Sequence, residues 1–289
     1  MQIDRGYFEG WYLKQQTSAG AVAFIPAFHR EKAGRTTASL QIITDEISWN
    51  VPFDTWQYER GRVFILGSSR FTPQGCHLDV SGQGISVKGS LRFSHLTPPK
   101  YDIMGPFCCI PFMQCRHSVF SLCHQVNGCV YINGTPYQFN NAPGYMEGDR
   151  GVSFPWRYLW TQCSWNAGSV MLSVADIPFL GGHFTGCIGT VYGNGIERRF
   201  ATYLGARIEM ISSDIIRVRQ GKSVLTIRLL KRQEKPLLAP VFGGMTRTIH
   251  ESLSCRVLYD LRENGREMMH FVTDRASFES VWDTNDAAP

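Results

Sequence analysis

The chain has 289 residues and a formal net charge of +5, from 29 Lys and Arg against 24 Asp and Glu. Its length corresponds to about two domains, and its basic residues form no run longer than pairs such as Arg198-Arg199, which argues against a nucleic-acid partner. The apolar stretches are far shorter than the roughly 18 residues of a membrane span, and the opening MQIDRGYFEG contains no apolar signal segment. We therefore expect a cytoplasmic protein without a transmembrane segment.

Short apolar-polar alternations, interrupted by Gly, Asn and Pro, predict β-strands along the whole chain. Early examples are VAFIPAFH and ASLQIIT, at 22–29 and 38–44. Later, Asn127-Gly128 separates SVFSLCHQV from CVYI, and Asn194-Gly195 separates TVYG from IERRFATYL; both pairs predict two-residue hairpin turns. Only 245–252, MTRTIHES, is a candidate for a short helical turn. We therefore predict an all-β fold of antiparallel sheets closed into barrels.

A short repeat divides the chain into two nearly equal halves. The sequence GYFEG at 6–10 returns as GYMEG at 144–148, and each copy opens a strand-like stretch with Trp. This spacing predicts a duplicated barrel, with one domain at 1–141 and the other at 142–289. The Pro-rich segment from Pro98 to Pro111 is then a long connection that folds over a barrel mouth.

The nine cysteines fit neither a disulfide framework nor a zinc site. Their number is odd, and the sequence contains no Cys-x-x-Cys. With a hairpin at Asn127-Gly128, Cys123 and Cys129 would lie on opposite faces of the sheet. We expect free thiols that act as small hydrophobic side chains, and no bound metal.

Residues 102–162 are rich in Trp, Phe, Tyr, Pro, Gly and His and poor in Lys and Glu. Large aromatic side chains supply apolar walls, and polar groups among them are costly to bury unless they form hydrogen bonds. This composition predicts the lining of an apolar pocket that contains a few polar groups.

The joint pattern of YFEGWYLK, IMGPF, PFMQCRH, YMEG and RGVSFPWRYLWTQ resembles the tocopherol cyclase family over most of the chain. The resemblance implies two lipocalin-like (calycin) barrels in tandem. It also implies a cofactor-independent enzyme that closes a chromanol ring by adding a phenolic hydroxyl across a prenyl double bond, with relatives among carotenoid hydratases and cyclases that guide pericyclic reactions. The chain departs from the family pattern at Gly148, Arg150 and Ser164, which predicts a changed ligand.

Ring closure of this type needs an acid beside apolar walls that exclude water. Glu9 shares a strand face with Tyr7 and Trp11, and Glu147 shares one with Tyr145. A desolvated carboxyl group in such a place has a raised pKa and can remain protonated near neutral pH. We predict catalytic roles for both acids and substrate contacts for Tyr7, Trp11 and Tyr145. The alternative for each acid is a structural ion pair with an arginine.

Two histidines and one aromatic strand complete the predicted site. His124 and His117 lie on opposite faces of one predicted strand, so only one can point into a given pocket. We expect His124 to shuttle protons and His117 to contact substrate, although a hydrogen-bonded core histidine is the alternative reading. Trp156, Trp160 and Gln162 share a face of a later strand and predict an aromatic wall, for which ordinary core packing is the alternative.

These features predict acid-catalysed cyclisation or hydration of a prenylated or polyunsaturated apolar small molecule. Two alternatives remain open at the level of sequence: a non-catalytic carrier of a hydrophobic molecule, and a barrel that preorganises a polyene for pericyclic closure. The orientation of Glu9, Glu147 and His124 relative to a closed apolar cavity distinguishes the three functions.

Overall fold

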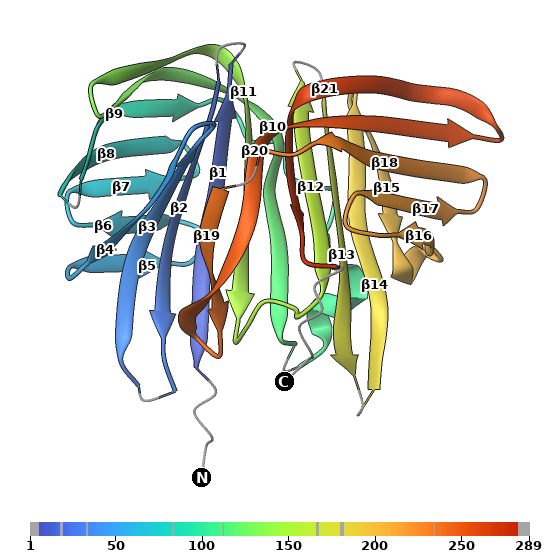
Figure 1. Cartoon of the computed structure of the whole chain (residues 1–289), viewed down its shortest axis with the longest axis horizontal. Helices are drawn as coiled ribbons and strands as arrows, with labels where there is room; N and C mark the ends of the chain where they lie inside the picture. Colours follow the sequence, from blue (N-terminus) through green and yellow to red (C-terminus); the bar gives the residue numbers. More distant parts are fainter. Residues whose placement is uncertain are drawn as a thin grey trace.

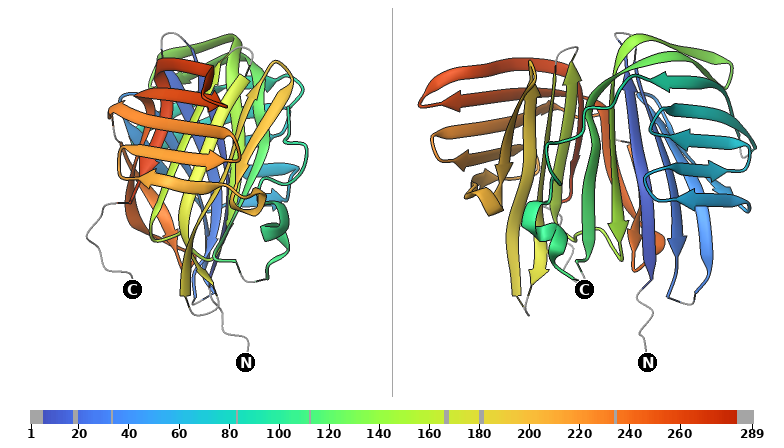
Figure 2. Two further views of the ribbon diagram at one scale, coloured as in Figure 1. Left: turned by 90° about the vertical axis from the view of Figure 1, so that its right-hand side faces the viewer. Right: turned by 180° about the vertical axis from the view of Figure 1, so that it is seen from behind.

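Two antiparallel sheets, each curled around its own apolar core, make up the computed structural model (Figure 1). It describes residues 6–17, 20–32, 34–82, 84–111, 113–165, 168–179, 182–233 and 235–282. The prediction of an all-β fold is confirmed, and the two sheets stand side by side as tandem barrels (Figure 2).

The first barrel has the strand order β4-β3-β2-β1-β11-β10-β9-β8-β7-β6-β5. Its elements, with the 3-10 helix η1, are β1 (Tyr7–Gln16), β2 (Ala21–Arg30), β3 (Thr36–Thr44), β4 (Ser48–Phe53), β5 (Trp56–Glu59), β6 (Val63–Leu66), β7 (Ser69–Thr72), β8 (Gly75–Gly82), β9 (Ile85–Phe93), η1 (Gly105–Cys109), β10 (Cys115–Ile132) and β11 (Thr135–Gly151).

The second barrel has the strand order β15-β14-β13-β12-β21-β20-β18-β17-β16, and β19 also pairs with β20. Its elements are β12 (Tyr158–Trp165), β13 (Gly168–Phe179), β14 (Gly182–Gly193), β15 (Ile196–Ala201), the 3-10 helix η2 (Thr202–Leu204), β16 (Arg207–Ile211), β17 (Ile215–Gln220), β18 (Ser223–Lys231), β19 (Lys235–Val241), β20 (Gly244–Glu263) and β21 (Arg266–Ser280).

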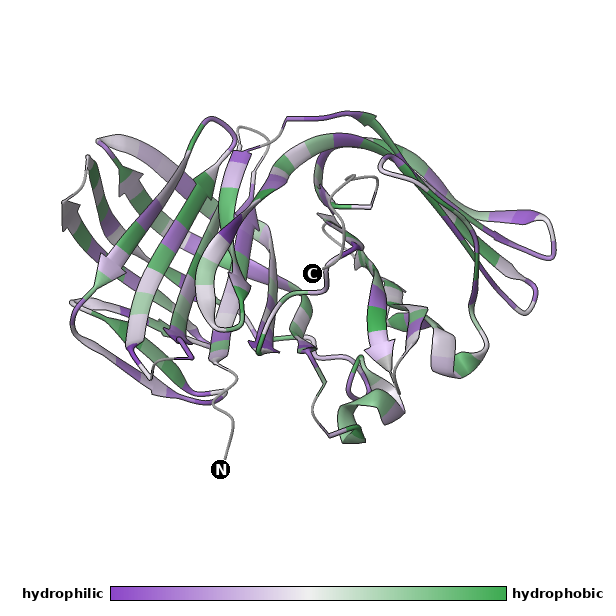
Figure 3. Cartoon of the chain, turned by 60° about the horizontal axis from the view of Figure 1, so that its bottom comes forward, coloured by the Kyte–Doolittle hydropathy of each residue, from purple (hydrophilic) through white to green (hydrophobic). Residues whose placement is uncertain are grey.

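Apolar side chains fill the interior of each barrel. Hydrophobic and hydrophilic residues alternate along the strands (Figure 3), and the inward set forms one packed cluster per barrel. Trp11, Phe64 and Phe71 belong to the first cluster, and Phe200 and Tyr259 belong to the second. Such packing leaves the space between the barrels, rather than a barrel lumen, as the place for a ligand.

A third apolar cluster joins the barrels. Tyr12 and Ile43 from the outer face of the first barrel meet Tyr158, Trp160 and Ile249 from the second. Strands β19 and β20 extend across the first barrel, where the side-chain amide of Gln41 exchanges two hydrogen bonds, of 3.0 and 2.9 Å, with the backbone of Leu238. The outer faces of β1 to β3 are therefore buried instead of solvated.

The chain passes from the first barrel to the second after β11. The predicted boundary between residues 141 and 142 falls inside β11, which pairs with β1 and β10 as far as Gly151. The two copies of the repeat, at 6–10 and 144–148, thus lie on neighbouring antiparallel strands of one sheet, with Trp11 opposite Gly148. The crossing segment between the barrels is 152–157.

One predicted hairpin is confirmed and one is wrong. Asn194-Gly195 forms the turn between β14 and β15, with positive φ at both residues. Asn127-Gly128 instead lies within β10, whose turn comes at Asn133-Gly134. Gly128 is needed there for close backbone approach, since a Cβ atom would lie 2.2 Å from the carbonyl oxygen of Ser90.

The structure also tests the predictions for the segment 245–252 and for the cysteines. The expected helical turn at 245–252 is part of strand β20. All nine cysteines lie within the described ranges and are free thiols, as expected. Within those ranges, no helix has the length and apolar character that a membrane crossing requires.

The long connection after β9 reaches the second barrel. We call residues 94–111 the strap. Arg199 of β15 donates hydrogen bonds to the carbonyl oxygens of Tyr101 and Asp102, both at 2.8 Å, and the Tyr203 hydroxyl donates to that of Ile103 at 3.1 Å. The strap therefore bridges the two barrels, and η1, within it, lies beside the space between them (Figure 2).

Candidate active site

A cavity of about 180 Å³ lies between the two barrels. Residues of β1 to β3, β10 and β11 form one side, β12 to β14 and β19 to β21 form the other, and η1 closes part of the rim. Most of the lining is apolar, and Met104, Phe107, Trp160, Ile188 and Ile249 are typical members. The acidic groups of the lining gather in two clusters.

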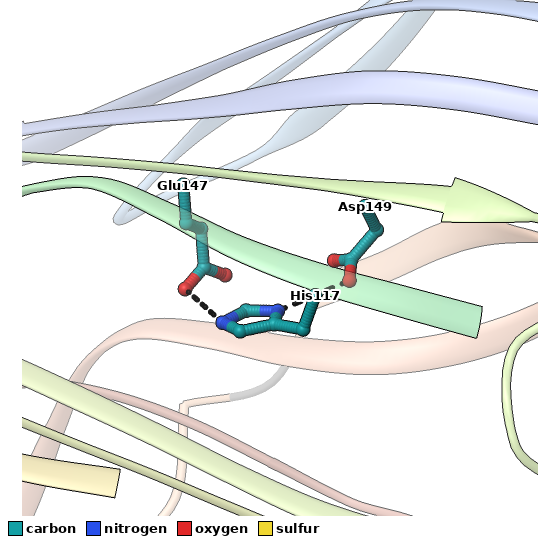
Figure 4. Close-up of side chains that lie close together, drawn as sticks. All are labelled: His117, Glu147 and Asp149. Carbon is teal, nitrogen blue, oxygen red and sulfur yellow. Dashed lines mark hydrogen bonds and ion pairs between the residues drawn. The ribbon is translucent and has the colours of Figure 1, made fainter. Parts of the chain in front are cut away.

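The first cluster is built by β10 and β11. Glu147 and Asp149 are two residues apart, so both side chains leave the same face of β11, and His117 lies directly opposite Asp149 on β10. The imidazole lies between the two carboxylates (Figure 4), with Nδ1 3.0 Å from Asp149 Oδ1 and Nε2 3.2 Å from Glu147 Oε2. The intervening Gly148 faces Phe120 and the first barrel.

Further donors hold Glu147. The Tyr145 hydroxyl donates a hydrogen bond of 2.5 Å to Glu147 Oε2, and the indole Nε1 of Trp160 donates to the same oxygen at 3.3 Å. Burial alone would lower the pKa of His117, but the charges of Glu147 and Asp149 outweigh it and raise that pKa well above its usual value. His117 is therefore an imidazolium ion at neutral pH.

The second cluster is a pair of buried carboxyl groups. Glu251 of β20 and Glu279 of β21 are direct cross-strand partners, and both line the cavity. The Tyr12 hydroxyl donates to Glu251 Oε1 at 2.6 Å, and the Tyr158 hydroxyl donates to Glu279 Oε1.

Desolvation favours the protonated form of this carboxyl pair. Burial raises the pKa of Glu251 to about 7 against the opposing effect of the Tyr12 hydrogen bond. Burial and the neighbouring Glu251 raise the pKa of Glu279 well above its usual range. The pair therefore retains at least one proton at neutral pH, as a general acid requires.

A neutral imidazole lies elsewhere in the cavity wall. His29 of β2 is 3% exposed, and burial lowers its pKa to about 4. Its Nε2 lies 3.4 Å from Ser39 Oγ, and its Nδ1 has no hydrogen-bond partner among the residues that the structure describes.

Glu9 lies away from the cavity lining. Arg60 donates to both of its carboxylate oxygens, at 2.9 and 2.7 Å, and the hydroxyls of Tyr58 and Tyr7 donate at 2.6 and 2.5 Å. Burial would raise the pKa of Glu9, but the hydrogen bonds from Arg60 and the two tyrosines lower it overall. This geometry matches the ion-pair alternative. Trp11 belongs to the first barrel's core and only borders the cavity.

His124 also lies outside the cavity lining. Its ring packs on Phe93, its Nδ1 lies 3.0 Å from Ser121 Oγ, and burial lowers its pKa to about 4. Register shifts in β10 between Val119 and His124 alter the strict alternation that the sequence implied. His117, rather than His124, is the histidine of this strand that reaches the cavity.

The predicted aromatic wall is only partly assembled. Tyr158 and Trp160 line the cavity, whereas Trp156 precedes β12 and stacks with Arg247. Gln162 is fully buried below the lining, where its amide donates to Ser164 Oγ at 2.6 Å.

Among the polar residues of the cavity that sequence reasoning missed are Tyr12, His29, Asp149, Glu251 and Glu279. Asp149 could have been found, because it lies two residues after Glu147 and strand periodicity puts both on one face. Glu251 lies in the segment that was expected to be helical, and Glu279 lies in no motif. Their proximity depends on the pairing of β20 with β21.

The first cluster also has the residue types of a metal site. The donor atoms of His117, Glu147 and Asp149 lie within 4.8 Å of one another. The two ring nitrogens face different carboxylates, and one imidazole presents only one nitrogen to an ion. The arrangement therefore fits an ion-paired imidazolium better than a ligand set, and the expected absence of metal stays a prediction.

Comparison with known proteins identifies solved structures that share this fold. No curated protein sequence matches the chain. The crystal structure of CghA with Sch210972 is similar, with 11% identity, coverage of 97% of this chain and 90% of that chain, and a TM-score of 0.60. Kievitone hydratase from Nectria haematococca has 8% identity, coverage of 96% and 89%, and a TM-score of 0.57. A putative AttH from Nitrosomonas europaea has 10% identity, coverage of 96% and 92%, and a TM-score of 0.52.

At these identities the solved structures show a shared fold. The model of the tocopherol cyclase-like family matches residues 108–178. That range contains His117, Glu147, Asp149, Tyr158 and Trp160, all of which line the cavity. The resemblance to the tocopherol cyclase family is thus confirmed for residues 108–178, the segment that supplies one polar cluster and part of the aromatic wall of the site.

Proposed function

We propose that the protein is an enzyme that cyclises or hydrates an unsaturated apolar small molecule by acid-base catalysis between its two barrels. One observation carries the proposal: a buried carboxyl pair, Glu251 and Glu279, whose pKa values desolvation raises, lines the same apolar cavity as the ion-paired His117 and Glu147. Two groups of titratable residues with opposite pKa requirements are the usual arrangement for separate acid and base roles.

Glu279, supported by Glu251, acts as the general acid. Tyr158 and Tyr12 engage the Oε1 atoms of the two carboxyl groups, which leaves the Oε2 atoms to carry the proton. The acid transfers this proton to one alkene carbon, the π electrons form the new C–H bond, and positive charge develops on the more substituted carbon. Aromatic and apolar walls stabilise that cation and exclude water that would trap it at random.

Glu147 acts as the acceptor on the other side of the reaction. A hydroxyl oxygen, from a phenol for cyclisation or from water for hydration, forms the C–O bond with its lone pair and releases its proton to the Glu147 carboxylate. His117 holds that carboxylate in place, and Asp149 fixes the ring through Nδ1. This assignment differs from the sequence-based expectation, in which Glu147 is the acid.

The comparisons support the reaction class. The matched family is described as tocopherol cyclase-like, and one protein of the same fold is named a hydratase. The ionisable lining favours acid-base chemistry over the pericyclic alternative, which needs only apolar, aromatic and amide groups. We assign no catalytic role to Glu9 or His124, because both lie outside the lining residues.

The test is turnover of 2-geranylphenol, a prenylated phenol with an allylic double bond. Cyclisation gives a chroman of unchanged mass, and hydration adds the mass of one water; chromatography with mass spectrometry distinguishes the two. We expect Glu279→Gln to reduce turnover by at least ~100-fold with little change in affinity.

The exposed residue Glu209, which pairs with Arg219 on β17, supplies the control. Glu209→Gln should behave as the parent protein does. Binding of 2-geranylphenol and its homologues of different chain length without any conversion would identify the protein as a carrier and contradict the proposed catalysis.

A further inference from the structure

We propose that the cavity selects neutral or cationic apolar ligands that present a hydrogen-bond donor, and rejects anionic ligands such as carboxylates and diphosphates. This inference rests on the site of the proposed function, but it concerns binding and does not require turnover.

The charge of the lining is the first observation. Four of the described lining residues carry carboxyl groups, namely Glu147, Asp149, Glu251 and Glu279. No Lys or Arg is among the described residues of the lining. The whole chain has a net charge of +5, so this acidic lining is a local feature of the cavity. An anion placed there would lose its hydration without gaining a cationic partner, which is strongly unfavourable.

The single cationic side chain of the lining is already neutralised. His117 faces Asp149 at 3.0 Å through one nitrogen and Glu147 at 3.2 Å through the other. An anionic ligand could approach this imidazolium only by displacing a carboxylate. Around this ion pair the described lining residues add two further carboxyl groups, Glu251 and Glu279, and no Lys or Arg.

Two basic residues outside the lining that act electrostatically on the carboxyl pair are engaged elsewhere. Lys14 donates to the carbonyl oxygen of Arg275 at 3.1 Å, and Arg247 donates to those of Pro155 and Trp156 at 3.0 and 2.7 Å. The charge of Lys14 acts to lower the pKa of Glu251, and that of Arg247 acts to lower the pKa of Glu279. Neither side chain lines the cavity, so neither is a direct partner for an anionic ligand.

The hydrogen-bonding atoms of the lining also match a donor on the ligand. Carboxyl oxygens dominate the two polar clusters, and those of Glu147 already act as acceptors, for the Tyr145 hydroxyl and the Trp160 indole N–H. A hydroxyl or an ammonium group supplies the missing donor, whereas a carboxylate or phosphate supplies only further acceptors. The ligand class that fits is therefore an apolar molecule with an alcohol, phenol or amine function.

A matched set of probes tests this selection. We would measure the affinities of 1-octanol, 1-octylamine and octanoate by titration calorimetry at about pH 8, where the amine and the acid are both ionised in water. Octanol and octylamine should each bind at least ~10-fold more tightly than octanoate, because one unit of like charge in a partly buried site has at least this effect. Octanoate binding as tightly as octanol would overturn the proposal.

Two variants connect the selection to the acidic lining. Glu147→Gln and Asp149→Asn should each reduce the advantage of octylamine over octanoate, while Glu209→Gln on the exposed face of β16 should leave it unchanged. An unchanged advantage in both cavity variants would contradict the assignment to this site. If the proposed catalysis alone is wrong, the order of affinities still holds and 2-geranylphenol is bound but not converted.

Discussion

Glu251 shows how one buried side chain links the stability of the protein to pH. Its folded pKa of about 7 lies above the ordinary value of 4.5, so the unfolded chain releases this proton at a lower pH than the folded protein does. The stability contributed by the protonated group is complete below pH 4.5 and is lost as the pH rises through about 7. The size of the loss is about 3 kcal/mol.

Replacement of Glu251 by Gln should remove this dependence. We expect the free energy of unfolding of Glu251→Gln, measured relative to that of the parent protein, to increase by about 3 kcal/mol between pH 4.5 and 7.5, because only the parent loses this stability. Chemical denaturation at several pH values measures it, and comparison of the two proteins cancels the contributions of other titrating groups. Glu263→Gln, on the same strand but away from the cavity, is the control. A difference that stays constant with pH would show that Glu251 is not buried in its acid form.

The residues of the site differ in how well sequence could predict them. Glu147 and Trp160 were identified because each lies in a compact motif beside aromatic residues. Glu251 and Glu279 were missed because the pairing of two distant strands, rather than any local pattern, brings them together. His124 was preferred to His117 for its apolar neighbours, but most of those neighbours face the core of the first barrel, and His117 is the histidine that lines the cavity.

The strap shows how a connecting element can shape the site. Its anchor, Arg199, is 9% exposed, pairs with Glu197 at 2.7 Å and stacks over the ring of Tyr101 at 3.6 Å. The strap then places Met104 and Phe107 at the rim of the cavity. Its Pro-rich sequence predicted a long covering loop, but the target, the second barrel, could not be inferred from composition.

Loss of the guanidinium fork should loosen the strap. Arg199→Lys keeps the charge but cannot hold the Tyr101 and Asp102 carbonyl oxygens together with Glu197. We expect amide hydrogen exchange across residues 100–107 to become about tenfold faster, as local opening becomes easier. Arg198→Lys, on the opposite face of β15, should not change it. Equal exchange rates in both variants would mean that the strap is held by its other contacts.

The central feature of the whole molecule is a site built from the outer surfaces of two filled barrels. Sequence patterns predicted the barrels, because alternation reports which face of a strand is apolar. They did not predict how the barrels dock, although the composition of β1 is consistent with a strand that is buried on both faces. From Trp11 to Gln16 all its residues are buried, including Lys14, because one face packs on its own core and the other faces the second barrel.

The most direct test of this account is a crystal structure of the Glu279→Gln variant with 2-geranylphenol bound. We predict that the ligand lies between the barrels, with its phenolic oxygen within hydrogen-bond distance of Glu147 and its allylic double bond beside residues 251 and 279. The chain should extend along Phe107 and Trp160. A ligand inside the core of either barrel, or a double bond remote from both residues 251 and 279, would contradict the proposed site.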